Sequence, residues 1–274
     1  MNRMTLVQAL ICDNGKAIVL LGDRLVTMSL GDGAIEYETE SDSSKIYLFQ
    51  NNVIGFAGSL IDIIRIKNKI KNESCSINDF IKNLISIIND LIKEDKEQVI
   101  LQITQNTLEK FITDTQGDSG HIPNEIKNIV YSKLAEFKMD CGALAAGFDE
   151  NGKPHIYVIN DYGVARDCSD LSNFSIGSGD AFSTILFDQE CYKVSCSLSE
   201  GLYFAYRAKK AAEAHVGVGK NTDIIILRFG KSPYLINAED ENNKLMDDLY
   251  NLEKMKMKDC RKKIFLKIEG GLKL

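Results

Sequence analysis

Several short runs near the start of the chain consist almost wholly of apolar residues at successive positions. They cover residues 6–11, 17–21 and 53–57. A strand with one solvent-exposed face alternates apolar and polar residues. A strand that is apolar on both faces has to be covered from both sides. Turn signals at residues 13–15, 31–33 and 50–52 indicate β-hairpins. The first sixty residues therefore predict sheet structure enclosed between other layers.

The period of the apolar residues then changes to that of amphipathic helices. From residue 60 they recur three and four positions apart, which predicts helices over about 60–70, 76–92, 98–113 and 123–138. Ser76 followed by Asp79 is a plausible start for the second of these helices. This middle part of the chain is expected to be helical throughout.

Strand signals return after residue 141 and are followed by a second helical block. We expect strands over 142–148, 155–159 and 174–179, with a short one through 165, then helices over 181–187 and 198–215. Ser197 and Glu200 form a capping box at the start of the longer helix. A last strand over 222–229 precedes a helical, charged tail from residue 238. Separate blocks of strands and helices predict an α+β fold, and strands apolar on both faces between two helical layers suggest a sandwich.

Charge and length exclude several classes of function. The chain has 274 residues and a formal net charge of −6, so we expect neither a nucleic-acid binder nor a membrane-surface protein. The densest basic stretch, 254–267, is interrupted by apolar residues and indicates an amphipathic terminal helix. No apolar run reaches the length of a membrane span, and the first ten residues do not have the pattern of a signal peptide. Seven scattered cysteines favour reduced thiols and a cytoplasmic location.

Common catalytic and cofactor motifs are missing from the sequence. None of the three histidines stands in a metalloprotease or serine-hydrolase motif, and the spacing of Cys191 and Cys196 fits no common zinc site. The Gly177–Gly179 segment lacks the following basic residue of a phosphate loop. We therefore predict no metal and no cofactor.

An ordered set of short motifs carries more information than any single residue. In this order and approximate spacing, the chain resembles a divergent proteasome β-type subunit, a member of the N-terminal nucleophile (Ntn) hydrolases. The resemblance covers about residues 4–95 and 141–229 and implies a four-layer αββα sandwich, with two antiparallel sheets between helical layers. The motifs are Met4-Thr5, Gly22-Asp23-Arg24, Ser44-Lys45-Ile46, Ala57-Gly58 with Asp62, and Ile176-Gly177-Ser178-Gly179.

The resemblance implies a catalytic role for five residues. In that family the nucleophile is the hydroxyl of an N-terminal Thr, here Thr5, whose own α-amino group is the general base. Lys45 would supply a positive charge near the attacking oxygen, and Asp23 would hold that ammonium group in place. The backbone N–H of Gly58 would stabilise the oxyanion, and Ser178 would position the free amino group.

The amino group of Thr5 has to be released before it can act as a base. Met4 directly precedes Thr5. A translation start at Met4, followed by removal of that methionine, would leave Thr5 as the first residue; otherwise residues 1–4 would be a very short propeptide. If the amine stays acylated, Thr5 is only a β-favouring residue at the start of a strand.

The chain also departs from the family pattern. The intervals from Thr5 to Asp23 and from Asp23 to Lys45 are longer than usual in the family. Where the family has a supporting Asp, Ser and Gly near the end of the long helix, this chain has His215, Val218 and Gly219. We predict a single proteasome-like domain over 1–274, with a helical insertion at about 96–138 and the tail at about 238–274.

Three functions agree with these residues. The first is a threonine-type peptidase that hydrolyses peptide bonds through an acyl-enzyme on Thr5. The second is a catalytically inactive ring or scaffold subunit. The third is a proteasome-like peptide ligase, which the start Met4–Val7 resembles; an unrelated amidohydrolase is the remaining alternative. The resemblance implies a homo-oligomeric ring, a peptide or unfolded-protein substrate and a possible ATP-dependent unfoldase.

Overall fold

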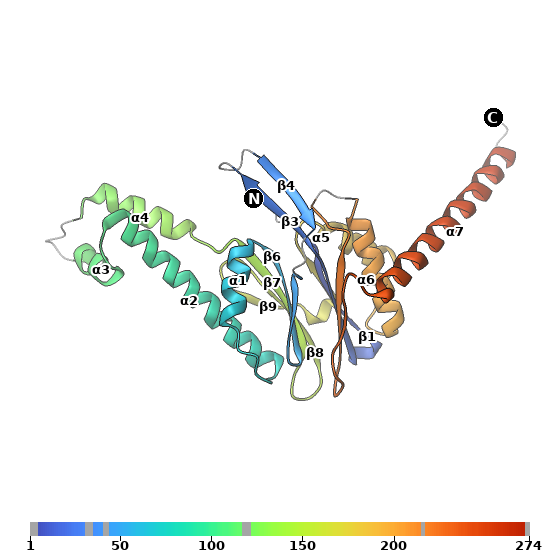
Figure 1. Ribbon diagram of the computed structural model, residues 1–274, viewed down its shortest axis with the longest axis horizontal. Coiled ribbons are helices and arrows are strands. Elements are labelled where there is room, and N and C mark those ends of the chain that lie inside the picture. Colours follow the sequence, from blue (N-terminus) through green and yellow to red (C-terminus); the bar gives the residue numbers. More distant parts are fainter. Residues whose placement is uncertain (1–4, 31–34, 41–43, 117–121, 215–216, 272–274) are drawn as a thin grey trace.

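Two β-sheets packed face to face form the centre of the molecule, and helices cover both outer faces (Figure 1). The computed structural model describes residues 5–30, 35–40, 44–116, 122–214 and 217–271. The expected turn at residues 31–33 falls outside these ranges. Within them the fold is the predicted α+β αββα sandwich of antiparallel sheets.

The first sheet has the order β10-β1-β2-β11-β12. All its neighbouring strands are antiparallel, and Val7 of β1 lies opposite both Gly22 of β2 and Ile176 of β10. Short β12 at its edge was not predicted. The strands are β1 (Val7–Cys12), β2 (Ala17–Asp23), β10 (Asn173–Ile176), β11 (Thr222–Arg228) and β12 (Tyr234–Ile236).

The second sheet has the order β5-β6-β7-β8-β9 and is also antiparallel. A separate two-stranded ribbon joins β3 (Leu25–Leu30) to β4 (Ile35–Glu40), a strand that the sequence analysis missed. The strands of the second sheet are β5 (Ile46–Phe49), β6 (Asn52–Gly58), β7 (Cys141–Phe148), β8 (Pro154–Ile159) and β9 (Ala165–Asp167).

The apolar strands divide their side chains between two sets of contacts. In β1, Val7, Ala9 and Ile11 face the other sheet, while Leu10 and Cys12 face helices. In β6, Val53 lies between the sheets and Phe56 packs against helices. This alternation is why runs that are apolar on both faces fold here without exposing either face to water.

The helices beside the second sheet extend beyond it as an arm (Figure 1). They are α1 (Leu60–Lys69), α2 (Ile77–Thr104), α3 (Leu108–Gln116) and α4 (Asn124–Glu136). The prediction of separate helices over 76–92 and 98–113 was wrong, because α2 continues through the charged residues 93–97. Glu94 and Asp95 there pair with Lys69 and Arg65 of α1. The outer part of the arm has its own small core, which contains Ile100, Phe111 and Val130.

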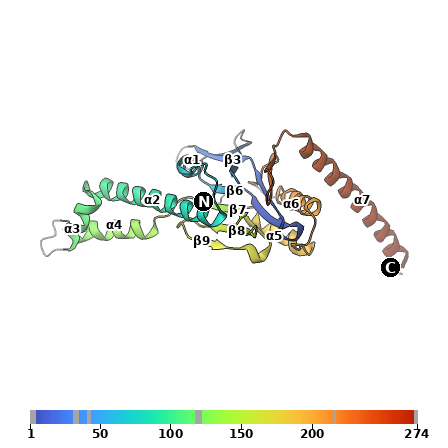
Figure 2. The same cartoon turned by 90° about the horizontal axis from the view of Figure 1, so that it is seen from below.

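The first sheet is covered by α5 (Asp180–Gln189) and α6 (Leu198–Ala212). The Ser197–Glu200 capping box forms as expected at the start of α6. The tail forms α7 (Glu241–Gly271), which leaves the body on the side opposite the α2–α4 arm (Figures 1 and 2). Within the described ranges, no helix is both long enough and apolar enough to cross a membrane.

Candidate active site

Thr5 lies two residues before the start of β1, at the end of the sandwich where β2 ends and β5 begins. Asp23 is the last residue of β2, and Lys45 directly precedes β5 in the other sheet. These residues can meet because the two sheets are in close contact here. A Cβ added to Gly55 of the second sheet would lie only 2.4 Å from Cγ1 of Val7 in the first sheet. Because Thr5 is two residues from Val7, its side chain reaches the gap between the sheets.

The hydroxyl of Thr5 lies between a cation and a carboxylate. Its Oγ1 donates to Oδ1 of Asp23 at 2.5 Å and accepts from Nζ of Lys45 at 2.5 Å. Lys45 Nζ also lies 3.1 Å from the same Asp23 oxygen. The structure thus brings together three residues that the sequence analysis selected from three separate segments.

Burial controls the electrostatics of this cluster. Thr5 is 1% exposed and Asp23 is fully buried. Burial of the Lys45 ammonium lowers its pKa below the usual range, and the neighbouring Asp23 carboxylate opposes that shift only in part. Lys45 therefore gives up a proton more readily than a surface lysine would.

Asp23 receives hydrogen bonds on both carboxylate oxygens. Besides the Thr5 and Lys45 side chains, Oδ1 accepts from the N–H of Leu6 at 3.0 Å. Oδ2 accepts from the N–H groups of Gly219 at 2.7 Å and Leu25 at 3.3 Å. A buried carboxylate with this many donors is held in one orientation, which in turn fixes the Thr5 hydroxyl.

The segment after β10 holds the backbone of Thr5. The N–H of Thr5 donates to Oγ of Ser178 at 3.2 Å, and its carbonyl accepts from the N–H of Gly179 at 3.2 Å. A side chain on Gly177 would place Cβ 2.2 Å from the Thr5 carbonyl oxygen, at a φ of +102°. Glycine is therefore required where this loop crosses Thr5.

Gly58 lies at the same end of the second sheet. Gly58 is the last residue of β6 and pairs with Cys141 of β7. Two residues before Gly58, the N–H of Phe56 donates to the carbonyl of Lys45 at 3.0 Å. The φ of Gly58 is +131°, and a Cβ there would lie 2.1 Å from the carbonyl oxygen of Asp140. The backbone at Gly58 thus needs glycine, and its role as an oxyanion donor stays a prediction.

Sequence analysis missed a fully buried lysine near Asp23. Lys209 of α6 is fully buried, and its Nζ donates to Glu213 and to the carbonyl of Lys220. Burial lowers the pKa of Lys209 below its usual range, while the Glu213 carboxylate opposes the shift. The only sequence signal was the Lys209–Glu213 spacing on α6, which is equally common on exposed helices.

The loop that carries Gly219 is held from two sides. Lys209 binds the Lys220 carbonyl, and Oε1 of Glu40 accepts from the N–H groups of Lys220 at 2.5 Å and Asn221 at 3.4 Å. These contacts direct the Gly219 N–H toward Asp23. Glu40 and Lys209 thus position a donor that the Thr5 cluster uses.

The structure describes two of the three residues that stand where the family has its supporting Asp, Ser and Gly. Gly219 contacts Asp23 as its position suggested. Val218 is 7% exposed and packs in a small apolar cluster with Leu6 and Ala212. His215 lies outside the described residues.

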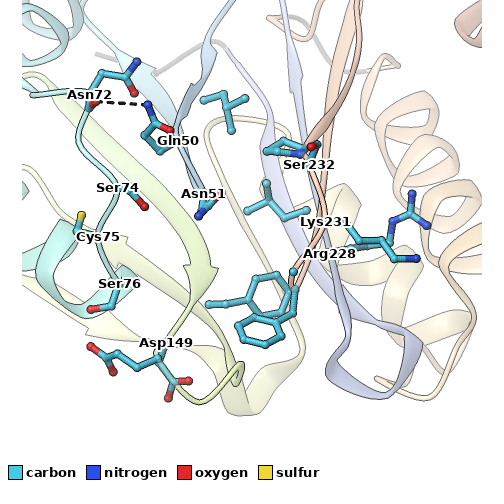
Figure 3. A pocket seen from close by; sticks show the side chains of 17 residues that line it. Gln50, Asn51, Asn72, Ser74, Cys75, Ser76, Asp149, Arg228, Lys231 and Ser232 are labelled. Atoms are coloured by element: carbon cyan, nitrogen blue, oxygen red, sulfur yellow. Dashed lines mark hydrogen bonds between the residues drawn. The ribbon is translucent and has the colours of Figure 1, made fainter.

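A separate cavity lies at the opposite end of the sandwich (Figure 3). It has a volume of 910 Å³, and its lining includes Asn72 and Ser74–Ser76 on one side and Arg228, Lys231 and Ser232 on the other. Arg228 pairs with Ala17, whereas Asp23 at the other end of β2 pairs with Thr222. The cavity is therefore distant from Thr5 and takes no part in its cluster.

Comparison with known proteins identifies the architecture. Residues 118–227 match a family model described as Proteasome subunit. The structure is similar to Anbu (ancestral β-subunit) from Yersinia bercovieri, with a TM-score of 0.62 and 14% identity over 92% of this chain and 95% of that one. The chain is a divergent proteasome-like protein.

A second solved structure supports the same assignment. The proteasome-like protein is also similar to an Anbu (Gly-1) mutant from Hyphomicrobium sp. strain MC1, with a TM-score of 0.58, 12% identity and coverage of 93% of this chain and 96% of that chain. No curated protein matches its sequence. At such low identity the likeness establishes the fold, and the chemistry has to be argued from the Thr5 cluster.

Proposed function

We propose that this proteasome-like protein is a threonine-type peptidase that hydrolyses peptide bonds through an acyl-enzyme on Thr5. The observation that supports it is the position of Thr5 Oγ1, 2.5 Å from both Lys45 Nζ and Asp23 Oδ1. A cation this close favours the negative charge that an attacking oxygen develops. Asp23 keeps that cation at the hydroxyl.

The reaction needs a free amine on Thr5. Once the bond to Met4 is cut, the uncharged amine takes the hydroxyl proton while Oγ1 attacks the substrate carbonyl carbon. The C–N bond then breaks, and the leaving amine carries away the proton. Water, deprotonated by the same amine, hydrolyses the ester and restores Thr5.

Ser178 and Gly58 complete the proposed machinery. Ser178 Oγ already lies 3.2 Å from the Thr5 nitrogen, where it would orient the released amine. Gly58 would donate its N–H to the oxyanion. The protein would act in the cytoplasm as a homo-oligomeric ring on peptides or unfolded proteins, with an ATP-dependent unfoldase as a possible partner.

The decisive experiment combines intact mass with reaction at Thr5. The protein is expressed with its natural start and no N-terminal tag, and then treated with a peptide electrophile that captures threonine hydroxyls. The proposal predicts a chain that begins at Thr5, one adduct per chain located on Thr5, and no adduct in Thr5→Ala. A processed, folded chain that neither reacts nor cleaves peptides would overturn it.

One observation favours the alternative of an inactive ring or scaffold subunit. Thr5 is 1% exposed and, in the printed sequence, its nitrogen is acylated by Met4. Assembled protein that retains Met1 would support this alternative. A peptide ligase would keep the Thr5 acyl-enzyme but pass it to an amine, so the masses of the products separate ligation from hydrolysis.

A further inference from the structure

The outer part of α7 carries apolar side chains that nothing in the described structure covers. Every side chain from Lys254 to Phe265 is exposed. Met255 and Phe265 are each 59% exposed, and Ile264 is 48% exposed. Figures 1 and 2 show this part of the helix extending away from the body. Exposed apolar side chains gathered on one helix mark a surface that a partner would cover.

Only the first part of α7 is anchored. Met246 is buried against the first sheet's outer core, Asp247 lies 2.7 Å from Lys210, and Glu253 lies 3.2 Å from Arg207. Beside these anchors Leu245, Leu249 and Leu252 remain 55%, 42% and 43% exposed. The exposed apolar side chains therefore run along both the anchored and the projecting parts.

A groove marks the point where the anchored part ends. It has a volume of 560 Å³ and lies between α6 and α7. Leu249 and Leu252 line it from the anchored side, and Met257 and Cys260 line it from the projecting side. The groove thus contains residues from both parts of the helix.

Charge is divided between the same two parts. Residues 241–253 contain four acidic side chains and one basic one, a net charge of −3. Residues 254–267 contain seven basic side chains and one acidic one, a net charge of +6. Two parallel copies of this helix would place like charges together, whereas two antiparallel copies would place the basic part of each against the acidic part of the other.

We propose that two copies of this chain associate through antiparallel pairing of their α7 helices. A two-fold axis passes near Leu252 and Glu253, where the acidic part changes to the basic part. The Met257 and Cys260 segment of each copy covers Leu249 and Leu245 of the other. The interface is isologous, so the same surface of each copy supplies both sides.

Cysteine crosslinking tests the direction of pairing. Residues near the axis meet their own counterparts, while Cys260 lies eight residues from Leu252, so its two copies would be about 24 Å apart at 1.5 Å per residue. A disulfide needs Cα atoms within roughly 7 Å of each other. Leu252→Cys in a Cys191→Ser, Cys260→Ser background, oxidised with copper phenanthroline, should form a covalent dimer. Native Cys260 in a Cys191→Ser background should not.

Other crosslinking patterns would overturn the proposal. A dimer through Cys260 as well as through Leu252→Cys would indicate parallel pairing. No dimer from either variant at the concentration where the protein assembles would show that α7 does not pair. Binding of the protein to phosphatidylserine vesicles without a Leu252→Cys dimer would assign the basic helix to a membrane surface instead.

Charge reversal provides an independent test. Lys258→Glu with Lys262→Glu should raise the dissociation constant of the α7-dependent dimer by at least about tenfold, because acidic residues would then face acidic residues. Mixing this variant with Glu241→Lys, Asp248→Lys protein should restore association. All four side chains are exposed, so the folded chain should tolerate the changes. A mixture that associates no better than the first variant alone would overturn the charge pairing.

Discussion

The two ends of the sandwich each place a hydroxyl beside titratable groups, but they arrange them differently. At one end Thr5 Oγ1 lies between the Lys45 ammonium and Asp23. At the other end Ser169 Oγ donates to Asp167 and lies 3.5 Å from Nδ1 of His155. The difference is the mostly buried Lys45 cation: it favours an alkoxide on Thr5, whereas the acidic surroundings of Ser169 disfavour one.

The surroundings of Ser169 indicate a structural role. His155 lies 3.1 Å from Asp167 and 3.5 Å from Asp149, so carboxylates lie on both sides of its ring. Partial burial raises the pKa of Asp167, but hydrogen bonds from Ser169 and His155 outweigh it and leave the pKa below the usual value. Ser169 also accepts the N–H of Ile156, which ties the turn after β9 to β8. A hydroxyl next to a histidine is therefore not enough to identify a nucleophile.

Replacement of Thr5 tests the comparison most severely. Thr5→Ala should lower peptide hydrolysis by at least about 10³-fold, because it removes the attacking oxygen. Thr5→Ser, which keeps the hydroxyl and the amine, is the matched control and should retain turnover. Hydrolysis is measured with a mixture of short peptides, and circular dichroism checks the fold. Turnover that persists in Thr5→Ala would place the nucleophile elsewhere.

Removal of the Lys45 cation should have the next largest effect on activity. Lys45→Ala should lower kcat/KM by about 10²-fold or more, because the oxygen loses its stabilising charge. Since burial lowers the pKa of Lys45, the alkaline limb of the wild-type pH profile should lie below 10.5, the ordinary value for lysine. Lys45→Arg, which stays charged, should lose that limb. An unchanged alkaline limb in Lys45→Arg would show that another group titrates there.

The same burial predicts how stability depends on pH. The folded pKa of Lys45 and of Lys209 is lower than the unfolded one, so folding disfavours their charged forms. Their contribution to the free energy of unfolding is unfavourable at low pH and improves as the pH rises through the interval between the folded and unfolded values. Denaturant titrations in the alkaline range would check the sign. The free energy of unfolding should depend less steeply on pH in variants that lack either lysine.

Lys209 should affect stability more than chemistry. Lys209→Met removes one of the two lysine partners of Glu213, which keeps Lys210, and one of the two donors to the Lys220 carbonyl, which keeps Thr222. The cost should be about 2 kcal/mol. The double variant Lys209→Met, Glu213→Leu should recover part of this loss, because the carboxylate that lost its buried partner is gone. Chemical denaturation measures both. Equal destabilisation in the two variants would show that Glu213 is solvated independently of Lys209.

The smallest effects are expected at the Ser169 end. Ser169→Ala removes hydrogen bonds in a turn, so it should lower the free energy of unfolding by about 1 kcal/mol. Peptide hydrolysis should be unchanged, because Ser169 lies outside the proposed machinery. A large loss of hydrolysis in folded Ser169→Ala protein would abolish the distinction between the two ends.

The sequence was sufficient to predict the layers and much of the Thr5 cluster. Strands β1, β2 and β6 are apolar on both faces, and this pattern has few solutions other than a covered sheet. Thr5, Asp23, Lys45 and Ser178 were found because short motifs mark the strand ends and turns where they lie, and the structure joins them by hydrogen bonds.

The remaining features depend on contacts between distant segments. The break expected in α2 was wrong because the Lys and Glu residues within 93–97 are good helix formers and α1 supplies partners for Glu94 and Asp95. Burial of Lys209 depends on Lys220 and on the sheet below α6, so no local pattern reveals it. Glu40 acts from a strand whose pairing with β3 could not be read from its short, polar sequence.

The length of α2 gives the molecule a mechanical property. Its 28 residues span about 42 Å at 1.5 Å per residue, with the first half packed on the second sheet and the second half in the separate core of the arm. A helix of that length acts as a lever: a tilt of about 5° at its base would move its tip by roughly 4 Å. A small repacking beneath Phe80 and Leu84 would therefore move the tip of the arm by a larger distance. The distance between a fluorophore on the tip of the arm and one on the second sheet would report a change that is too small to detect at the sheet itself.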